Sequence, residues 1–223
     1  ELHIAPGSFG HIYEEFYPSV DIKVLLEQFM ASEENILILY GPPGTGKTSF
    51  IKYLVSHQSQ RSRNEGMIAY AKDEKCIAHS GLWNHLLGEK YGLMILDDAD
   101  SLLEPRKNGI NEPLSQLLSF SDGMFKNKTK IIITTNQTVR EIDEALIRPG
   151  RCFDFIVLEP MSYDYAKNIW INILGSPEEI FNKCFKGLTT ISQASLMGEH
   201  NRVRLNMKSR NYMDRGRRTE ASW

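Results

Sequence analysis

The sequence has no long hydrophobic run, few cysteines and no excess of one charge. Its apolar stretches fall short of the ~18 residues that a membrane-spanning helix needs, so no segment is expected to cross a membrane. The three cysteines, an odd number with no C-x-x-C pair, argue against a disulfide framework or a zinc site. They indicate reduced thiols, and with them a cytoplasmic location.

Composition indicates a folded protein with a real core. A chain of 223 residues with 41% hydrophobic and 24% charged residues excludes global disorder and small disulfide scaffolds. Internal repeats and low-complexity segments are absent from the sequence. The length fits one large domain, or one domain with a small appendage.

The net charge of -2 conceals two differently charged parts. Residues 200–223 hold seven basic and two acidic side chains, so the remainder of the chain is acidic. A basic end could contact nucleic acid, an acidic partner or a neighbouring subunit. The simpler interpretation is a solvated chain end.

Short apolar runs alternate with helical patterns up to residue 160. Such alternation predicts a three-layer α/β fold in which helices cover both faces of a parallel five-stranded sheet. Residues 20–30, 49–56, 81–87 and 114–120 have helical spacing. After Pro160 we expect only helices, over residues 163–174, 177–185 and 192–199. The expected strands are residues 35–40, 67–70, 93–96, 130–135 and 153–158.

A glycine-rich motif, GPPGTGKT, follows the first expected strand. It fits G-x-x-x-x-G-K-[ST], in which glycines let backbone N–H groups surround a phosphate and a helix begins beside the same anion. Lys47 would contact the β- and γ-phosphates, and the Thr48 hydroxyl would bind Mg²⁺. The residues expected to bind ATP are Gly41, Pro42, Pro43, Gly44, Thr45, Gly46, Lys47, Thr48 and Ser49.

Two acids end the strand over residues 93–96. A buried parallel strand would place them at the sheet edge that also holds the phosphate loop. Asp97 would then hold the Mg²⁺ ion through water, and Asp98 would orient and polarise the attacking water. A polar turn at the end of a strand is the alternative for this pair taken alone.

Three further polar residues are candidates for catalysis. Asn136 ends the strand over residues 130–135 and could bind the γ-phosphate or the water, or simply begin a turn. Arg148 and Arg151 bracket a Pro-Gly turn. Arginine supplied by a neighbouring subunit stabilises the transition state of phosphoryl transfer, although two surface arginines would have the same spacing.

These motifs, in this order, resemble the AAA family of ring-forming ATPases. The resemblance spans roughly residues 12–200 and includes GPPGTGKT, ILDDAD, TTN and EIDEALIRPGRCFD. It implies ATP hydrolysis with Mg²⁺ and a ring of identical subunits, a hexamer or heptamer. It also implies that Asn136 senses the γ-phosphate and that Arg148 and Arg151 act as arginine fingers on the neighbouring subunit's nucleotide.

A finer resemblance is to the branch that contains the mitochondrial translocase of the folded Rieske iron-sulfur protein. The segments LYGPPGTGKTSFI, GLWNHLL, LSQLLSFSDGM and TTNQTVREIDEALIRPGR are similar to that branch. Only residues 71–92 separate the second and third strands, with no aromatic-Val-Gly threading loop, and members of this branch act on folded clients. The acid at Asp98 departs from the pattern, because most of the family has Glu there and the branch has Glu-Asp.

The sequence therefore predicts a chaperone-like ATPase that remodels or translocates a protein client. The alternatives are a nucleic-acid-associated loader, suggested by the basic end, and a nucleotide-dependent scaffold with weak turnover. The expected organisation is an N-terminal linker and first helix over 1–34, a nucleotide-binding core over 35–160, and a short helical lid with a basic tail over 161–223. In the linker, Ile12 or Tyr13 would pack against adenine or within the core.

Overall fold

A computed structural model describes residues 14–61, 67–72, 74–79, 81–83, 91–104, 111–121, 129–207 and 210. They divide into two compact units. The first runs through Gly41 and continues from Lys47 to Leu158; the second joins Pro42–Gly46 to the chain from Glu159 onward. The linker residues Ile12 and Tyr13 lie outside the described ranges, so their predicted packing stays a prediction.

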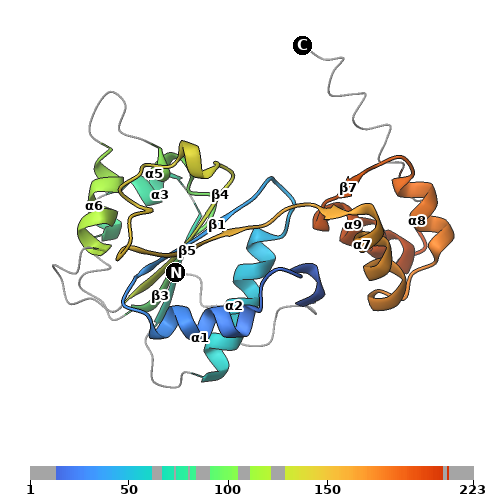
Figure 1. Cartoon of the computed structure of the whole chain (residues 1–223), viewed down its shortest axis with the longest axis horizontal. Helices are drawn as coiled ribbons and strands as arrows, with labels where there is room; N and C mark the ends of the chain where they lie inside the picture. Colours follow the sequence, from blue (N-terminus) through green and yellow to red (C-terminus); the bar gives the residue numbers. More distant parts are fainter. Residues whose placement is uncertain are drawn as a thin grey trace, which may run out of the picture. The chain divides into compact units, whose positions relative to one another are not determined.

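The first unit is built on a parallel five-stranded sheet in the order β2-β3-β4-β1-β5 (Figure 1). The sequence prediction of the sheet is confirmed, with strand bounds that differ by at most two residues. The strands are β1 (Ile36–Tyr40), β2 (Met67–Ala71), β3 (Tyr91–Leu96), β4 (Lys130–Thr135) and β5 (Cys152–Val157).

The central strands are apolar throughout because both of their faces are covered. All six residues of β4 are buried, as are the first four of β1. One face packs on α3 (Glu74–Ala78), α5 (Asp100–Leu103) and α6 (Glu112–Ser121), whose buried residues join those of the strands in one core cluster. Figure 1 shows α1 and α2 together on the opposite face.

Helix α1 (Ile22–Ala31) starts where Asp21 accepts hydrogen bonds from the N–H groups of Lys23 and Val24, as an N-cap does. Helix α2 (Lys47–Arg61) begins directly after the glycine-rich loop. The short helices η1 (Glu14–Phe16) and η2 (Val139–Glu141) complete the unit. Of the helix predicted over 81–87, residues 81–83 are helical and the others lie outside the described ranges.

The second unit is mainly helical. It contains α7 (Tyr163–Asn168), the π-helix η3 (Ile169–Ile173), α8 (Glu178–Phe185) and α9 (Gln193–Arg204). Its core is a cluster of aromatic rings. The ring centroid of Trp170 lies 5.9 Å from that of Phe181 and 6.1 Å from that of Phe185. The expectation of only helices after Pro160 was wrong in one respect: β6 (Met161–Ser162) and β7 (Thr190–Ile191) form a two-stranded antiparallel ladder. It was missed because two-residue strands carry no periodic pattern that the sequence could reveal.

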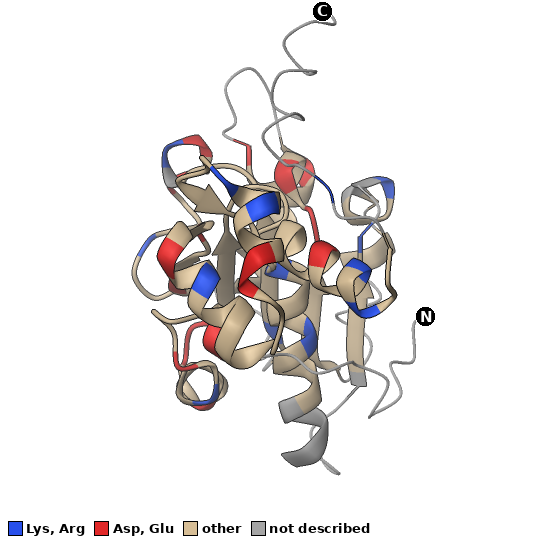
Figure 2. Ribbon diagram, turned by 90° about the vertical axis from the view of Figure 1, so that its right-hand side faces the viewer, with Lys and Arg blue, Asp and Glu red and all other residues tan. Residues whose placement is uncertain are grey.

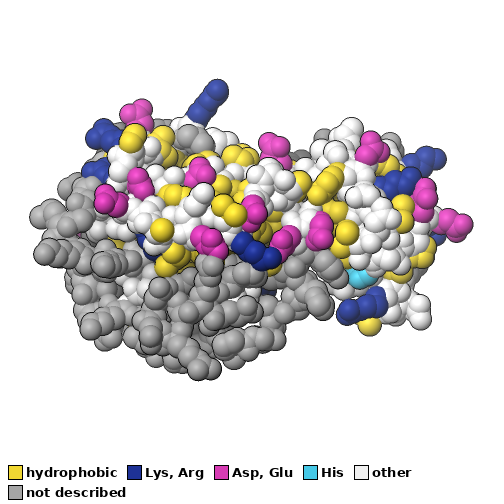
Figure 3. Space-filling view, turned by 60° about the horizontal axis from the view of Figure 1, so that its bottom comes forward, with side chains coloured by type: hydrophobic (Ala, Val, Ile, Leu, Met, Phe, Trp, Pro, Cys, Tyr) yellow, Lys and Arg dark blue, Asp and Glu magenta, His cyan; other side chains and the backbone are white. Residues whose placement is uncertain are grey.

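Among the described helices, none combines the length and apolarity that crossing a membrane requires. Acidic and basic residues are interspersed over the described helices and strands (Figure 2). On the face drawn in Figure 3, side chains of both charges likewise lie among hydrophobic ones. Most of the basic C-terminal end, residues 208–209 and 211–223, lies outside the described ranges.

Candidate functional site

The glycine-rich loop adopts backbone angles that glycine alone adopts readily. Gly44 and Gly46 have φ values of 83° and 100°. Between them, Thr45 is buried and donates both its N–H and its hydroxyl to the carbonyl of Pro42. The start of α9 packs on this loop within the second unit: the Ala194 N–H donates to the Gly44 carbonyl at 3.0 Å. The loop is therefore held in a turn of the kind that surrounds an anion.

Lys47 is the first residue of α2 and is 6% exposed. Its Nζ donates to the carbonyl of Gly41 at 2.5 Å and to Oδ1 of Asn136 at 2.7 Å. Burial lowers the pKa of Lys47, and the negative charges of Asp98, Asp100 and Asp97, in that order, oppose the shift. A phosphate bound here would contact the Lys47 ammonium group, which is buried and therefore poorly solvated.

The next residue, Thr48, faces the acidic end of β3. Its hydroxyl lies 3.3 Å from Oδ2 of the fully buried Asp97. The carboxylate also accepts a hydrogen bond from the Tyr70 hydroxyl at Oδ2, at 2.8 Å, and one from the Thr134 hydroxyl at Oδ1, at 2.7 Å. A hydroxyl and a carboxylate form an oxygen donor set that suits Mg²⁺ when substrate phosphates complete the shell. The residues present fit the expected ion.

Asp98 has φ of 56°, which is uncommon for a residue other than glycine. Its N–H donates to the Thr134 hydroxyl at 2.8 Å, and the same hydroxyl donates to Asp97. Thr134, the penultimate residue of β4, thereby connects both acids that follow β3. The Asp98 side chain is 46% exposed and forms an ion pair with Lys72.

Asp100 determines how the Asn136 amide is oriented. Its Oδ1 accepts from the Thr135 hydroxyl at 2.6 Å and the Asn136 N–H at 2.8 Å, and its Oδ2 accepts from Nδ2 of Asn136 at 3.1 Å. The amide carbonyl must then face Lys47, which can only donate. Burial favours a raised pKa for Asp100, but these hydrogen bonds and the charge of Lys47 outweigh it and hold the pKa below its usual value.

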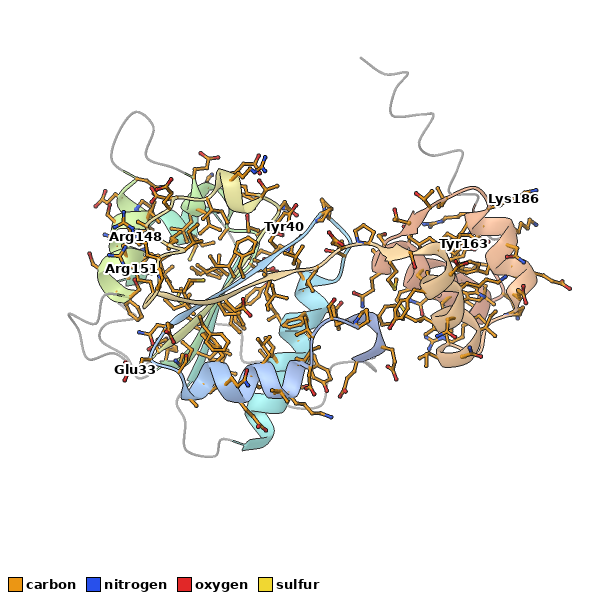
Figure 4. The ribbon with its side chains drawn as sticks, viewed as in Figure 1. Glu33, Tyr40, Arg148, Arg151, Tyr163 and Lys186 are labelled. Carbon is orange, nitrogen blue, oxygen red and sulfur yellow. The ribbon has the colours of Figure 1, made fainter. Side chains whose placement is uncertain are left out.

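The two predicted arginines lie at the other end of the sheet. Arg151 directly precedes β5, and its carbonyl accepts from the N–H of Ile36, the first residue of β1. Lys47 follows the far end of β1, whose five residues span about 16 Å. Arg148 is exposed, whereas Arg151 is half-buried and donates to the carbonyl of Ala145 at 2.8 Å. Figure 4 shows both arginines well separated from Tyr40 at the end of β1.

The structure therefore brings together Lys47, Thr48, Asp97 and Asn136, with Asp98 adjacent, but neither arginine. Pro42 and Pro43 are exposed in the loop, and Ser49 is half-buried on α2. The sequence prediction missed Tyr70, Lys72, Asp100 and Thr134. Each lies within four residues of the carboxyl end of a strand, which is the signal that selected Asp97, but which partners they meet depends on a strand order that the sequence does not state. A nucleotide loop joined to an acidic strand end and a polar strand end defines a phosphate-loop NTPase.

Comparisons with known proteins agree with this class and narrow it. Residues 37–160 match the family described as "ATPase family associated with various cellular activities (AAA)". The match covers more than half of the chain, so the chain belongs to this family of ATP hydrolases, as the motifs predicted.

Several known proteins are similar to part of the chain. The probable mitochondrial chaperone bcs1 of Schizosaccharomyces pombe is 33% identical over 126 residues, which are 51% of this chain and 26% of that protein. Mitochondrial chaperone BCS1 of Homo sapiens is 31% identical over 126 residues, 51% of this chain and 29% of that protein. A Bifidobacterium animalis protein named "AAA ATPase forming ring-shaped complexes" is 26% identical over 151 residues, 57% of this chain and 28% of that protein. The chain spans less than a third of each relative.

Proposed function

We propose that this chain is the motor module of a ring-forming ATPase that uses ATP and Mg²⁺ to remodel or translocate a protein client. The observation that carries the proposal is the convergence of Lys47, Thr48, Asp97 and Asn136 at the carboxyl ends of adjacent strands. In parallel α/β sheets, ligands bind at this edge.

Each residue has a role that its contacts support. The Lys47 ammonium would leave Gly41 and Asn136 for the β- and γ-phosphates, which are stronger acceptors because they are charged. Thr48 and Asp97 would hold Mg²⁺, directly and through water, and the ion would neutralise charge on the phosphate oxygens. Asn136, held by Asp100, would contact the γ-phosphate or the attacking water.

Asp98 is the proposed water-positioning residue. Its backbone is anchored to Thr134, and its carboxylate is close enough to Lys47 to raise that residue's pKa against the effect of burial. An exposed carboxylate beside the phosphate site can accept a proton from water as the γ-phosphate departs. The shorter Asp at this position makes slow turnover the expected regime.

The placement of the arginines supports a ring. Arg148 and Arg151 lie a full strand length from Lys47, too far for either guanidinium to reach the phosphates of its own subunit. We propose that they complete the site of a neighbouring copy, with the exposed Arg148 reaching outward and Arg151 shaping the turn through Ala145. The ring-forming name of the Bifidobacterium relative agrees with this proposal.

A protein client is the proposed target of the motor, because two of the relatives described above are named chaperones. Their similarity to this chain is confined to about half of it. A pull-down with the Asp98→Asn variant in its assembled form would identify the client and show whether it is folded when bound.

The first experiment measures binding of a fluorescent ATP analogue and release of phosphate. Lys47→Ala should abolish binding, whereas the control Lys52→Ala, an exposed position on the same helix, should leave it unchanged. Unchanged binding by Lys47→Ala would refute the assignment of the site.

A second experiment tests whether sites are shared between subunits. Arg148→Ala should bind ATP normally but lose turnover by about a thousandfold, as expected for an arginine finger. Mixing Arg148→Ala with Asp98→Asn subunits should restore part of the activity, because some interfaces then combine an intact acid with an intact arginine. No restoration in mixed assemblies would contradict the trans role.

A further inference from the structure

The end of β2 contributes to the acidic site, although the motifs that identify the family do not include it. The pairing of β2 with β3 continues one residue past the end of β3, because the Asp97 N–H donates to the Ala71 carbonyl at 2.8 Å. Tyr70 donates its hydroxyl to Asp97. Lys72, the first residue after β2, therefore lies next to both acids.

Lys72 bridges the two carboxylates. Its Nζ lies 3.2 Å from Oδ2 of Asp98 and 3.8 Å from Oδ2 of Asp97. The hydrogen bond to Asp98, with the fields of both carboxylates, raises the pKa of Lys72, so the side chain is an ammonium at neutral pH. The Lys72 side chain is 58% exposed and Asp97 is fully buried, so the ammonium lies on the solvent side of Asp97.

The Asp98 carboxylate needs a partner to define its direction. The contacts with Thr134 hold the Asp98 backbone, but they leave the side-chain torsions unrestrained. One methylene group joins the carboxylate to the backbone, so the position of its oxygens depends on the group with which they form a contact. Within the described residues, Lys72 is the residue that forms an ion pair with the Asp98 carboxylate.

We propose that Lys72 is a positioning residue for Asp98: its ammonium holds the carboxylate beside Asp97, directed to where the attacking water would stand. The inference rests on the proposed role of Asp98 in hydrolysis. Lys72 itself forms no bond to the substrate and transfers no proton. Its effect should therefore be seen in the rate of the chemical step and not in the affinity for ATP.

The test compares Lys72→Met and Lys72→Arg with the native protein. Lys72→Met should lower kcat about fivefold, while KM stays within about twofold. An exposed ion pair contributes at most about 1 kcal/mol, and a barrier raised by that amount slows a reaction about fivefold. Lys72→Arg keeps the charge and should retain most of the native kcat. Thermal unfolding of each variant verifies that the fold is intact.

The matched control is Lys23→Met. Lys23 forms an ion pair with Glu14 at 2.9 Å, and the two side chains are 54% and 55% exposed, close to the exposures of Lys72 and Asp98. This pair joins the start of α1 to η1, outside the site, so its loss should leave kcat unchanged.

Two results would overturn the inference: a Lys72→Met enzyme at least as fast as the native one, or a loss that Lys72→Arg fails to rescue. Failure of the proposed function has a different signature. If Asp98→Asn hydrolyses ATP as fast as the native protein, or the native protein hydrolyses none, the role of Asp98 is wrong and the inference about Lys72 falls with it.

Discussion

Replacing Asp100 by asparagine should turn the Asn136 amide away from Lys47. In the native protein, Oδ2 of Asp100 accepts from Nδ2 of Asn136, and this contact leaves Oδ1 of Asn136 to Lys47. An asparagine at position 100 can keep its carbonyl oxygen toward Thr135 and the Asn136 N–H. Its NH₂ group then faces the NH₂ of Asn136, and two donors cannot bond.

The magnitude follows from these contacts. Hydrogen bonds to a charged acceptor contribute about 1.5–3 kcal/mol each, toward the lower end for a half-buried group. The variant keeps two of the three, so the free energy of unfolding should fall by about 1–2 kcal/mol. A misdirected Asn136 should lower kcat by about 10- to 100-fold, as small displacements in an active site do.

The stability difference should also depend on pH. The pKa of Asp100 lies below its usual value, so the ionised group stabilises the fold above the pKa of an unfolded aspartate, about 3.9, and this contribution is lost as the pH falls toward the folded pKa. The gap between the native protein and Asp100→Asn should therefore be constant near neutrality and narrow below about pH 4.

Urea unfolding at several pH values and steady-state phosphate release would measure both effects. Asp21→Asn is the matched control, because asparagine caps a helix as well as aspartate does and this position lies outside the site. A variant at position 100 that loses stability but keeps the native kcat would refute the reasoning, since Asp100 would then be a structural residue only.

Three other substitutions test the fold itself. Gly44→Ala should weaken binding of an ATP analogue and lower the free energy of unfolding by about 1–2 kcal/mol, because φ is 83° and the added Cβ would lie 3.2 Å from the Cβ of Ala194. A native affinity in this variant would argue against the loop conformation. Asp21→Ala should lower the free energy of unfolding in urea by about 1 kcal/mol through loss of the N-cap, and no change would mean that the cap is unimportant. Phe181→Ala should cost about 3–5 kcal/mol in calorimetry, because the fully buried ring contacts Trp170; a loss under 1 kcal/mol would contradict the ring cluster.

Local patterns were sufficient to predict most of the fold. Strands such as β4 are buried on both faces, so they appear as unbroken apolar runs, and the turn between β1 and α2 carries a motif of its own. The ladder of β6 and β7 was missed because its strands pair residues about thirty positions apart, and strands of two residues show no periodic pattern. Helix α7 packs against both strands, and no local pattern records that contact.

In the candidate site too, some features could be predicted from the sequence and others could not. Lys47, Thr48 and Asp97 could be selected from the sequence, because a glycine loop and an acidic strand end are recognisable without their neighbours. The contacts of Asp100 with Asn136, and of Lys72 with Asp98, could not, because they join strands whose order the sequence does not state.

The sequence by itself therefore determined the class of chemistry, since phosphate binding requires particular residues at a fixed spacing along one turn of the chain. Only the tertiary structure decided how the charged groups are paired and how far Arg148 and Arg151 lie from Lys47. Those properties depend on distances across the sheet, and such distances arise when β2, β3, β4, β1 and β5 take their places side by side.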